Sequence, residues 1–354
     1  MKKDIVWLDY ARCLGIFLVI FGHTLQRFSV MEENGLLKMI WDYIYLFHMP
    51  LFFVISGYLF KKNAVNIANI KLGGGKLLRN IVVPYLLYQL IYFPFELFHL
   101  HGFTDISIWR KMLCGIIMGD GYESPYSMPV CLPCWFIVSI IQLRIIFLFI
   151  PITKTISVLL SIVSLAFLIL SKRSGLDLYF CIDSTIMSIP YFLVGYFIGK
   201  RQDIIKSYGK LAIIGVVSAL IVYLILIYNG AAQMNGPSFG KNIILNYLAG
   251  LSGTVFVFVL SMILANMFKS KIYVRTISRN TLFIIFSHWV LLAPCSIIIK
   301  NVLAKVSDNS FYILVVSIIV STTVLQLSKV MIEYGLRGFP VLFGKYKYLD
   351  KIKI

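Results

Sequence analysis

Residues 5–28 read IVWLDYARCLGIFLVIFGHTLQRF, and this stretch decides the class of the fold. It is apolar over the length of about 20 residues that a helix needs to cross a bilayer. Arg12 and His23 interrupt the apolar run. An ionisable group inside a membrane span is costly, so it usually has a function. The stretch therefore predicts a membrane-spanning helix that carries chemistry.

The spacing of Arg12 and His23 places both side chains on one face of that helix. Eleven residues at about 100° each make three turns plus roughly 20°, and the rise along the axis is about 16 Å. One helix face thus presents a permanent cation at one depth and a titratable imidazole at another. The alternative interpretation is a snorkelling arginine and a histidine that only packs against its neighbours.

The whole chain has the composition of a membrane protein. It has 354 residues, of which 59% are hydrophobic, and a mean hydropathy of +0.87. These values predict an all-α, polytopic integral membrane protein, organised as one membrane domain over residues 1–354 without a separate soluble domain. The first span is too long for a signal-peptide core and lacks a small-residue cleavage site, so we expect it to be retained. The ten expected spans lie near residues 5–28, 41–60, 80–98, 133–151, 154–171, 184–199, 209–228, 242–267, 281–299 and 311–332.

The net charge of +18 is mostly a topology signal and does not indicate nucleic-acid binding. With the N-terminus inside, 21 Lys and Arg residues fall in cytoplasmic segments and 9 in outer ones. Cytoplasmic loops carry the excess of Lys and Arg in membrane proteins. The asymmetry therefore predicts that both termini are cytoplasmic.

Two further histidines lie within spans. His48 precedes Pro50, which is expected to bend or break the second span and to free backbone carbonyls. His48 and His23 are at similar distances from the outer ends of their spans, so they are expected at matched depth. His288 lies near the middle of the ninth span. A histidine that packs between helices or bonds a freed carbonyl is the alternative for each.

The segment 61–79 is strongly basic and expected to be a cytoplasmic loop. It holds three consecutive glycines at 73–75, with Lys71, Lys76 and Arg79 around them. Backbone amides of a glycine run together with lysines can hold phosphates. A flexible loop that only obeys the positive-inside rule is the more frequent alternative.

The longest outer segment, 99–132, suits a sugar ligand. It contains carboxylates, and Tyr122, Tyr126 and Trp135 lie in or beside it. Residues 106–118 mix apolar and basic side chains and predict a short interfacial helix. A loop of this composition is also compatible with simple solvation.

Cys131 and Cys134 form a CLPC motif on the outer side. A disulfide or a redox role is open there. Neither a second cysteine pair nor a nearby histidine supports a zinc site, so no metal is expected.

These residues resemble the acyltransferase-3 superfamily of membrane O-acyltransferases. The pattern RCLGIFLVIFGH, with arginine and histidine eleven positions apart, opens a ten-span chain as in that superfamily. FHMPLFFVISGYLF resembles its fucose 4-O-acetylase-like branch. PCWFIVS, PYFLVGYFIGK, the pair Ser287-His288 and the basic C-terminal tail are further similarities. The resemblance covers roughly residues 4–345, and the extra periplasmic esterase-like domain of some members is not expected.

The resemblance implies transfer of an acyl group, usually acetyl, from cytoplasmic acetyl-CoA to a hydroxyl of a surface polysaccharide or lipid-linked sugar. The family's arginine corresponds to Arg12 and its histidine to His23. It implies a multi-pass protein of a bacterial inner membrane that contacts membrane lipids and does not bind nucleic acid. A homo-oligomer is compatible with the chain, and succinyl or another longer acyl group stays open.

The chemistry of the residues agrees with this expectation. Arg12 is placed to meet the coenzyme A head or arm, and His23 to act as general base on the acceptor hydroxyl or to form a transient acyl-histidine. His48 is the candidate oxyanion donor or orienting partner. The competing class is a proton-coupled transporter or a flippase of glycan precursors. Against it stand the scarcity of acidic residues in the spans and the lack of an internal repeat.

Overall fold

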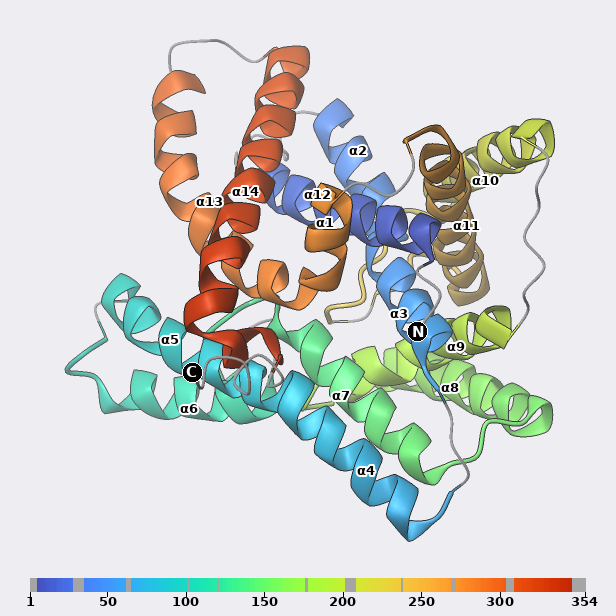
Figure 1. Cartoon of the computed structure of the whole chain (residues 1–354), viewed down its shortest axis with the longest axis horizontal. Helices are drawn as coiled ribbons and strands as arrows, with labels where there is room; N and C mark the ends of the chain where they lie inside the picture. Colours follow the sequence, from blue (N-terminus) through green and yellow to red (C-terminus); the bar gives the residue numbers. More distant parts are fainter. Residues whose placement is uncertain are drawn as a thin grey trace. The chain divides into compact units, whose positions relative to one another are not determined.

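The computed structural model describes the chain as a set of helices joined by short connections (Figure 1). The described residues are 5–27, 35–61, 65–100, 102–119, 121, 123–175, 178–200, 208–236, 238–268, 272–303 and 309–345. The elements are α1 (Val6–Arg27), α2 (Gly35–Tyr45), α3 (His48–Leu59), α4 (Ile67–Leu77), the π-helix η1 (Leu78–Val82), α5 (Val83–His99), α6 (Ile106–Met118), α7 (Cys134–Phe149), α8 (Lys154–Ser174), α9 (Ile182–Lys200), α10 (Tyr208–Asn229), α11 (Ile243–Phe268), α12 (Ile272–Arg279), α13 (Thr281–Leu303), α14 (Ser310–Gly338) and the 3₁₀-helix η2 (Pro340–Phe343).

The long apolar helices confirm an all-α, polytopic membrane protein. Within the described residues, eight helical stretches are long and apolar enough to span a bilayer. They are Val6–Arg27, Gly35–Leu59, Ile67–His99, Lys154–Ser174, Ile182–Lys200, Gly209–Asn229, Ile243–Phe268 and Ser310–Gly338. Two shorter apolar helices, Cys134–Phe149 and Thr281–Cys295, lie where the sequence predicts spans four and nine.

Contacts between Cα atoms divide the chain into two compact units that interleave along the sequence. The first unit comprises Met1–Ile55, Arg201–Gln233 and Phe239–Tyr334. The second comprises Ser56–Lys200, Met234–Ser238 and Gly335–Ile354. The chain passes from the first unit to the second within α3, so a membrane helix is shared between them.

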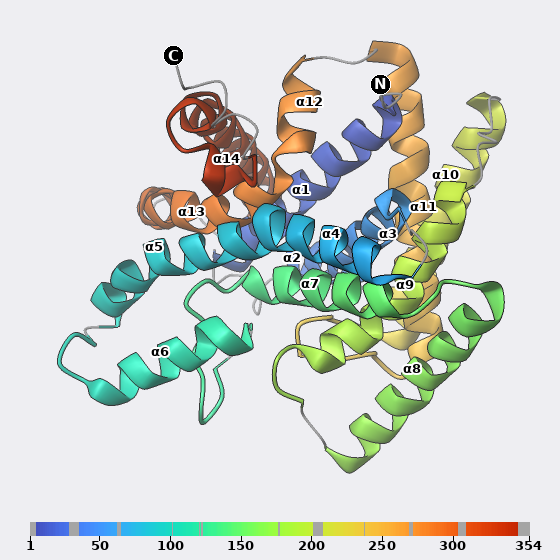
Figure 2. The ribbon, with the colours of Figure 1, turned by 60° about the horizontal axis from the view of Figure 1, so that its bottom comes forward.

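The first unit is built around α1. This helix packs against α2, α11, α12 and α13, and α10 lies side by side with α11 (Figures 1 and 2). A polar bond also joins α1 to α14, because the Ser321 hydroxyl donates to the Thr24 hydroxyl at 3.1 Å. Both hydroxyls are buried, so this bond satisfies polar groups that would otherwise be costly in a membrane.

The second unit is built around α7 and α9. The α7 helix packs against α4, η1 and α9, while α8 packs against α9. A close backbone approach joins the end of α3 to α9, because a Cβ added at Gly57 would lie 1.9 Å from the Phe192 carbonyl oxygen. Glycine is therefore required at this contact, in agreement with the role of small residues between membrane helices.

The predicted break at Pro50 is confirmed. α2 ends at Tyr45, two turn residues follow, and α3 begins at His48. Proline lacks the N–H that would bond to the carbonyl four residues earlier, so the helix cannot continue unbroken through this point. The break places Pro50 in the first turn of α3, where proline is tolerated.

The expectation of a flexible loop over 61–79 is wrong. Residues Ile67–Leu77 form α4, which continues through η1 into α5 as one helical run. The Asn66 side chain accepts a bond from the Asn69 N–H and starts the helix. Each glycine costs a helix about 1 kcal/mol. At Gly73 that cost has a packing reason, because a Cβ there would lie 2.4 Å from the Leu148 side chain.

Candidate active site

His23 lies near the C-terminal end of α1 with its ring enclosed by three others. The centroid of its imidazole is 5.4 Å from that of His288, 5.3 Å from Trp289 and 6.4 Å from Tyr45. Trp289 and Tyr45 both meet it nearly edge-on, at 87° and 84°. The side chain is half-buried. These contacts hold the imidazole in one orientation while leaving part of it accessible.

His48 lies on the other side of Tyr45. The centroids of these two rings are 4.5 Å apart, so Tyr45 contacts both His48 and His23. The interruption between α2 and α3 allows this contact, because it brings His48, at the start of α3, next to Tyr45 at the end of α2. Its Nδ1 donates to the Ile44 carbonyl at 3.0 Å. The alternative interpretation of His48, a hydrogen bond to a backbone carbonyl near Pro50, is therefore present in the structure.

His288 is fully buried on α13, with an exposed fraction of 0%. Its Nδ1 donates to the Ile284 carbonyl at 2.9 Å. Its Nε2 has no hydrogen-bond partner among the described residues, and neither does the hydroxyl of the neighbouring Ser287. Buried polar atoms normally have partners, and an exception needs an explanation. An atom of a substrate between His288 and His23 would supply one.

The three histidines share one tautomer. A carbonyl oxygen only accepts, so Nδ1 of His48 and of His288 carries the hydrogen when the ring is neutral. Nδ1 of His23 lies 3.2 Å from the Gln26 side-chain oxygen and follows the same rule. Each neutral ring consequently keeps its lone pair on Nε2. A backbone or side-chain acceptor on Nδ1 is the usual way to orient a basic histidine.

Arg12 lies on the same face of α1 as His23. Its Nη1 contacts the hydroxyl of Ser278 on α12 at 3.4 Å, and that hydroxyl donates to the Asp9 carboxylate at 2.5 Å. α12 and α13 are consecutive, with a single residue between them. Val6–Arg27 is one continuous helix, so the spacing of eleven residues keeps Arg12 and His23 on one face, where Arg12 meets α12 and His23 meets α13. Ser278 is buried and forms the bridge between the carboxylate and the guanidinium.

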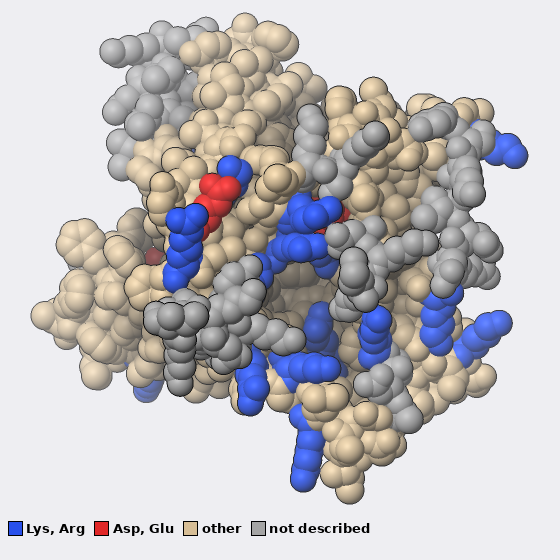
Figure 3. Space-filling model, in the orientation of Figure 1, with Lys and Arg blue, Asp and Glu red and all other residues tan. Residues whose placement is uncertain are grey.

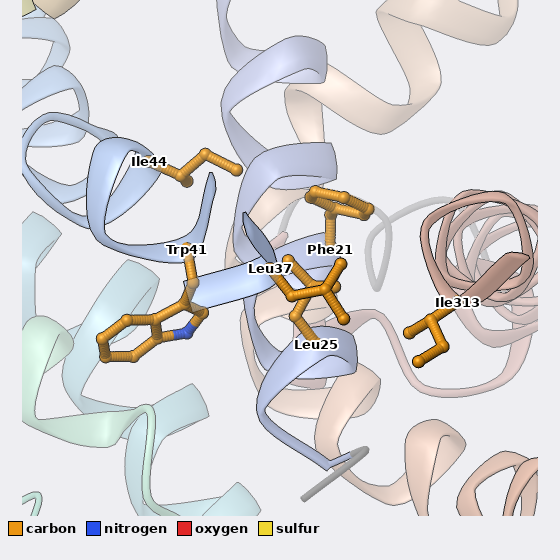
Figure 4. Close-up of a cluster of buried hydrophobic side chains, with 6 residues drawn as sticks. All are labelled: Phe21, Leu25, Leu37, Trp41, Ile44 and Ile313. Atoms are coloured by element: carbon orange, nitrogen blue, oxygen red, sulfur yellow. The ribbon is translucent and has the colours of Figure 1, made fainter. Parts of the chain in front are cut away.

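The C-terminal end of α1 is fixed by an apolar cluster (Figure 4). Phe21 and Leu25 on α1 pack with Leu37, Trp41 and Ile44 on α2 and with Ile313 on α14. Trp41 also stacks on Tyr45, with 3.7 Å between ring centroids. The cluster determines where the backbone on either side of His23 lies, and the stack determines where Tyr45 meets it.

Trp289 is a site residue that sequence reasoning missed. The guanidinium carbon of Arg27 lies 4.3 Å from the centroid of its ring, and the ring of His23 lies nearly perpendicular to it. The only available signal was that Trp289 follows His288 directly, which does not show that α13 packs beside α1. Tyr45 was missed in the same way, although it is three residues from His48.

A family model described as an acyltransferase domain, acyltransferase-3, matches residues 5–327. The chain belongs to the acyltransferase-3 family. The match covers most of both units and every residue described in this subsection. No curated protein and no solved structure matches the chain. Together with the apolar helices, the family identifies an integral, multi-pass membrane acyltransferase.

The remaining predicted site residues of this acyltransferase belong to the second unit. Lys71 and Lys76 are exposed on α4, and Arg79 is exposed on η1. Trp135 is buried in the first turn of α7, where its ring meets Phe136 edge-on at 6.2 Å. These four residues thus belong to the second unit, whereas the three histidines belong to the first.

The outer segment of the acyltransferase contains the predicted helix 106–118, which is confirmed as α6. Asp105 caps it by accepting from the Ser107 N–H at 2.8 Å, and its bonds to the side chain and backbone of Ser107 lower the pKa of the carboxyl. Lys111 pairs with Glu123 at 3.1 Å. Tyr126 is exposed and meets Tyr179, whereas Tyr122 lies outside the described residues.

Cys131 and Cys134 are free thiols in the structure and both are buried. Among the described residues, no group of three or more His, Cys, Asp or Glu side chains is arranged to hold a metal ion.

Proposed function

We propose that this acyltransferase is an O-acetyltransferase of a bacterial inner membrane. It moves acetyl from cytoplasmic acetyl-CoA to a hydroxyl of a surface polysaccharide or of its lipid-linked precursor. The observation that carries the proposal is the arrangement along one face of α1. Arg12 contacts Ser278 at one end, and about 16 Å away the half-buried ring of His23, which keeps a lone pair on Nε2, lies beside the rings of His288 and Tyr45.

The donor half of the reaction belongs to Arg12. Coenzyme A has a phosphate-bearing head and a long pantetheine arm that ends in the thioester. A guanidinium suits phosphate or carbonyl oxygens because its planar fork offers two parallel donors. The distance from Arg12 to His23 allows the arm to extend along α1 and bring the thioester to the imidazole. Lys71, Lys76 and Arg79 are exposed cations available for further phosphate contacts.

The transfer step uses His23 as the general base. Nε2 removes the proton of the acceptor hydroxyl as its oxygen attacks the thioester carbonyl carbon. The tetrahedral intermediate collapses with cleavage of the C–S bond, and the imidazolium returns the proton to the coenzyme A thiolate. In the variant mechanism Nε2 attacks the thioester carbonyl carbon first, and the C–S bond breaks to leave acetyl on the imidazole and release the coenzyme A thiolate. The acceptor oxygen then attacks the acetyl carbonyl carbon, the C–N bond to the imidazole breaks, and the proton of the hydroxyl balances the thiolate as free thiol.

The hydrogen bond of His48 favours one of the two roles proposed for it. Its Nδ1–H is used on the Ile44 carbonyl, so a neutral His48 can only accept at Nε2. It therefore suits the orienting role better than that of an oxyanion donor. The Tyr45 hydroxyl is the alternative donor, because the Tyr45 ring contacts both histidines. A hydroxyl aimed at the developing oxyanion would stabilise the transition state.

The acceptor half of the site has aromatic walls. Tyr45 and Trp289 meet the edges of His23, and Trp41 stacks on Tyr45. Such rings combine apolar faces with polar edges, a combination that suits a sugar with its C–H and hydroxyl groups. This arrangement supports a carbohydrate acceptor. We propose no specific sugar or hydroxyl position.

The orientation in the membrane follows from charge. The face of the molecule in Figure 3 carries many Lys and Arg side chains and few acidic ones. We propose that both termini are cytoplasmic, which puts the Arg12 end of α1 towards the acetyl-CoA pool and the His23 end towards the outer side.

The deciding experiment is transfer by the purified full-length protein in nanodiscs. With acetyl-CoA and an oligosaccharide acceptor, we expect release of the coenzyme A thiol and an acetyl ester on the acceptor, both detected by mass spectrometry. In cells, the O-acetyl signals in the NMR spectrum of the surface glycan should disappear in a deletion strain and return on complementation. If the purified protein carries a glycan across the membrane without consuming acetyl-CoA, the flippase interpretation replaces this one.

A further inference from the structure

Arg144 is an arginine inside an apolar helix, and no described carboxylate forms an ion pair with it. It lies in α7, and its Nε is buried with no hydrogen-bond partner among the described residues. None of the described ion pairs includes it. A guanidinium stays protonated in proteins, so the charge cannot be removed by losing a proton. Ionisable groups within membrane spans usually pair with an opposite charge or mark a ligand site.

The helices beside Arg144 add positive charge. A Cβ at Gly73 of α4 would touch Leu148 of α7, and the next segment, η1, also contacts α7. The two helical runs are therefore antiparallel (Figures 1 and 2). Arg144 lies four residues before Leu148 on α7, and α4 ends four residues after Gly73. Because the two helices are antiparallel, Arg144 lies level with the end of α4. Lys76 and Arg79 flank that level on α4 and η1.

The acidic residues of the second unit do not neutralise this region. The described ones lie near the end of α5, in the outer segment and in the first turn of α9, and they are Glu96, Asp105, Glu123 and Asp183. None lies on α4, η1 or α7. Three cations thus gather on adjoining helical segments without a described carboxylate on any of them.

The local backbone is also unusual. Residues Leu78–Val82 form a π-helix between two α-helices. Short π-helical segments are rare and occur frequently at functional sites. This segment carries Arg79 and directly contacts α7. The rare backbone and the buried Nε of Arg144, which has no partner among the described residues, are independent observations that point to the same place.

We propose that α7 and the α4–η1 run form a phosphate-binding site, with the half-buried Arg144 as its inner ligand and the exposed Lys76 and Arg79 as its outer ones. The planar guanidinium matches two phosphate oxygens, and the other two cations neutralise the remaining charge. The phosphate belongs either to the coenzyme A nucleotide or to a lipid headgroup. Only the nucleotide source rests on the proposed function.

The test measures both sources on the same variants of the full-length protein. Coenzyme A is titrated by calorimetry into protein in neutral phosphatidylcholine nanodiscs. Phosphatidylglycerol binding is measured by native mass spectrometry of the detergent-solubilised protein. Arg144→Gln is expected to weaken one of the two by about tenfold or more, the loss typical of a charge-assisted bond. Arg144→Lys is expected to recover part of it. The matched control is Arg173→Gln, which removes an exposed arginine of the same unit.

The outcomes separate the two sources from each other and from the proposed reaction. Loss of coenzyme A binding alone assigns the site to the nucleotide, and loss of phosphatidylglycerol binding alone assigns it to a lipid headgroup. If Arg144→Gln does not fold, the double variant Lys76→Gln/Arg79→Gln decides, because both side chains are exposed. Unchanged affinities for both ligands in the folded variants overturn the proposal. A wild type that does not turn over acetyl-CoA would refute the proposed function and still leave the lipid arm to decide this site.

Discussion

The imidazole rings of His23 and His288 lie with their centroids 5.4 Å apart, although 264 positions separate them in the chain. His23 is half-buried and bonded through Nδ1 to Gln26, whereas His288 is fully buried with an unpartnered Nε2. One ring is thus accessible to a substrate and the other lies behind it. The predictions below depend on this difference.

The first prediction concerns the general base. We expect His23→Ala to lower acetyl transfer per folded molecule by about 10²–10⁴-fold, the usual contribution of general acid–base catalysis. Coenzyme A binding, measured by calorimetry, should stay close to that of the wild type because Arg12 is untouched. His99→Ala removes a histidine of the second unit and serves as control. Full specific activity of His23→Ala would exclude a catalytic role.

His48 should matter less than His23. Asn at this position can still donate to the Ile44 carbonyl while lacking Nε2, so His48→Asn isolates the role of that atom. We expect a loss of about tenfold in kcat and an unchanged melting temperature. His48→Ala should lower both, since it leaves the carbonyl of the helix break without one of its donors. A loss in His48→Asn that exceeds the loss in His23→Ala would exchange the two roles.

His288 offers a parallel test of its unpartnered nitrogen. His288→Asn retains a donor for the Ile284 carbonyl, and His288→Gln places a polar group nearer the position of Nε2. If His288 positions the substrate or shares its proton, Gln should retain more activity than Asn at equal stability. Equal activities of both variants and the wild type would reduce His288 to a packing residue. The pH dependence of kcat should change only if His288 positions the substrate or shares its proton.

Arg12 and Ser278 should act together on the donor. Lys in place of Arg12 keeps the charge and loses the planar fork, so we expect Arg12→Lys to raise the KM for acetyl-CoA by about tenfold. Ser278→Ala removes the bridge to Asp9 and should raise the same KM by a smaller factor. The double variant should be close to Arg12→Lys alone, because coupled residues are not additive. Steady-state kinetics check all three, and an unchanged KM in Arg12→Lys would make Arg12 a packing charge.

Tyr45→Phe tests the oxyanion donor. The substitution keeps the ring that stacks on Trp41 and contacts the two histidines, and removes only the hydroxyl. Loss of one such donor is expected to lower kcat by about 10²–10³-fold with little effect on KM. Activity like that of the wild type would leave Tyr45 as a wall of the site and direct attention to other donors.

The membrane orientation is tested by labelling single cysteines in a cysteine-free background. Lys71 and Ala231 are exposed, so Lys71→Cys and Ala231→Cys suit this purpose. We expect a membrane-impermeant maleimide to label position 231 in intact cells and to reach position 71 only after the inner membrane is permeabilised. The reverse pattern would move the Arg12 end of α1 away from the cytoplasmic donor.

Local features of the sequence were enough to predict the class of fold and much of the first helix. Apolar length predicts a membrane span, because a lipid interior leaves helices as the main solution for hydrogen bonding. The break at Pro50 follows from a missing N–H, and the common face of Arg12 and His23 follows from helical periodicity. The prediction of a loop over residues 61–79 failed because it relied on the low helix propensity of glycine. In the structure Gly73 lies in a helix, where the absence of a side chain lets it pack against Leu148.

The environment of His23 was decided by the tertiary structure alone. Trp289, Tyr45 and His288 surround it because α13 and the broken α2–α3 run meet α1 at that height. Helical periodicity shows which side chains share a face, since it depends only on residues a few positions apart. Which face meets which depends on packing between segments hundreds of residues apart. For the same reason the sequence shows Arg144 within an apolar run but does not show which helical segments lie beside it. The structure places α4 and η1 there, and neither carries a carboxylate.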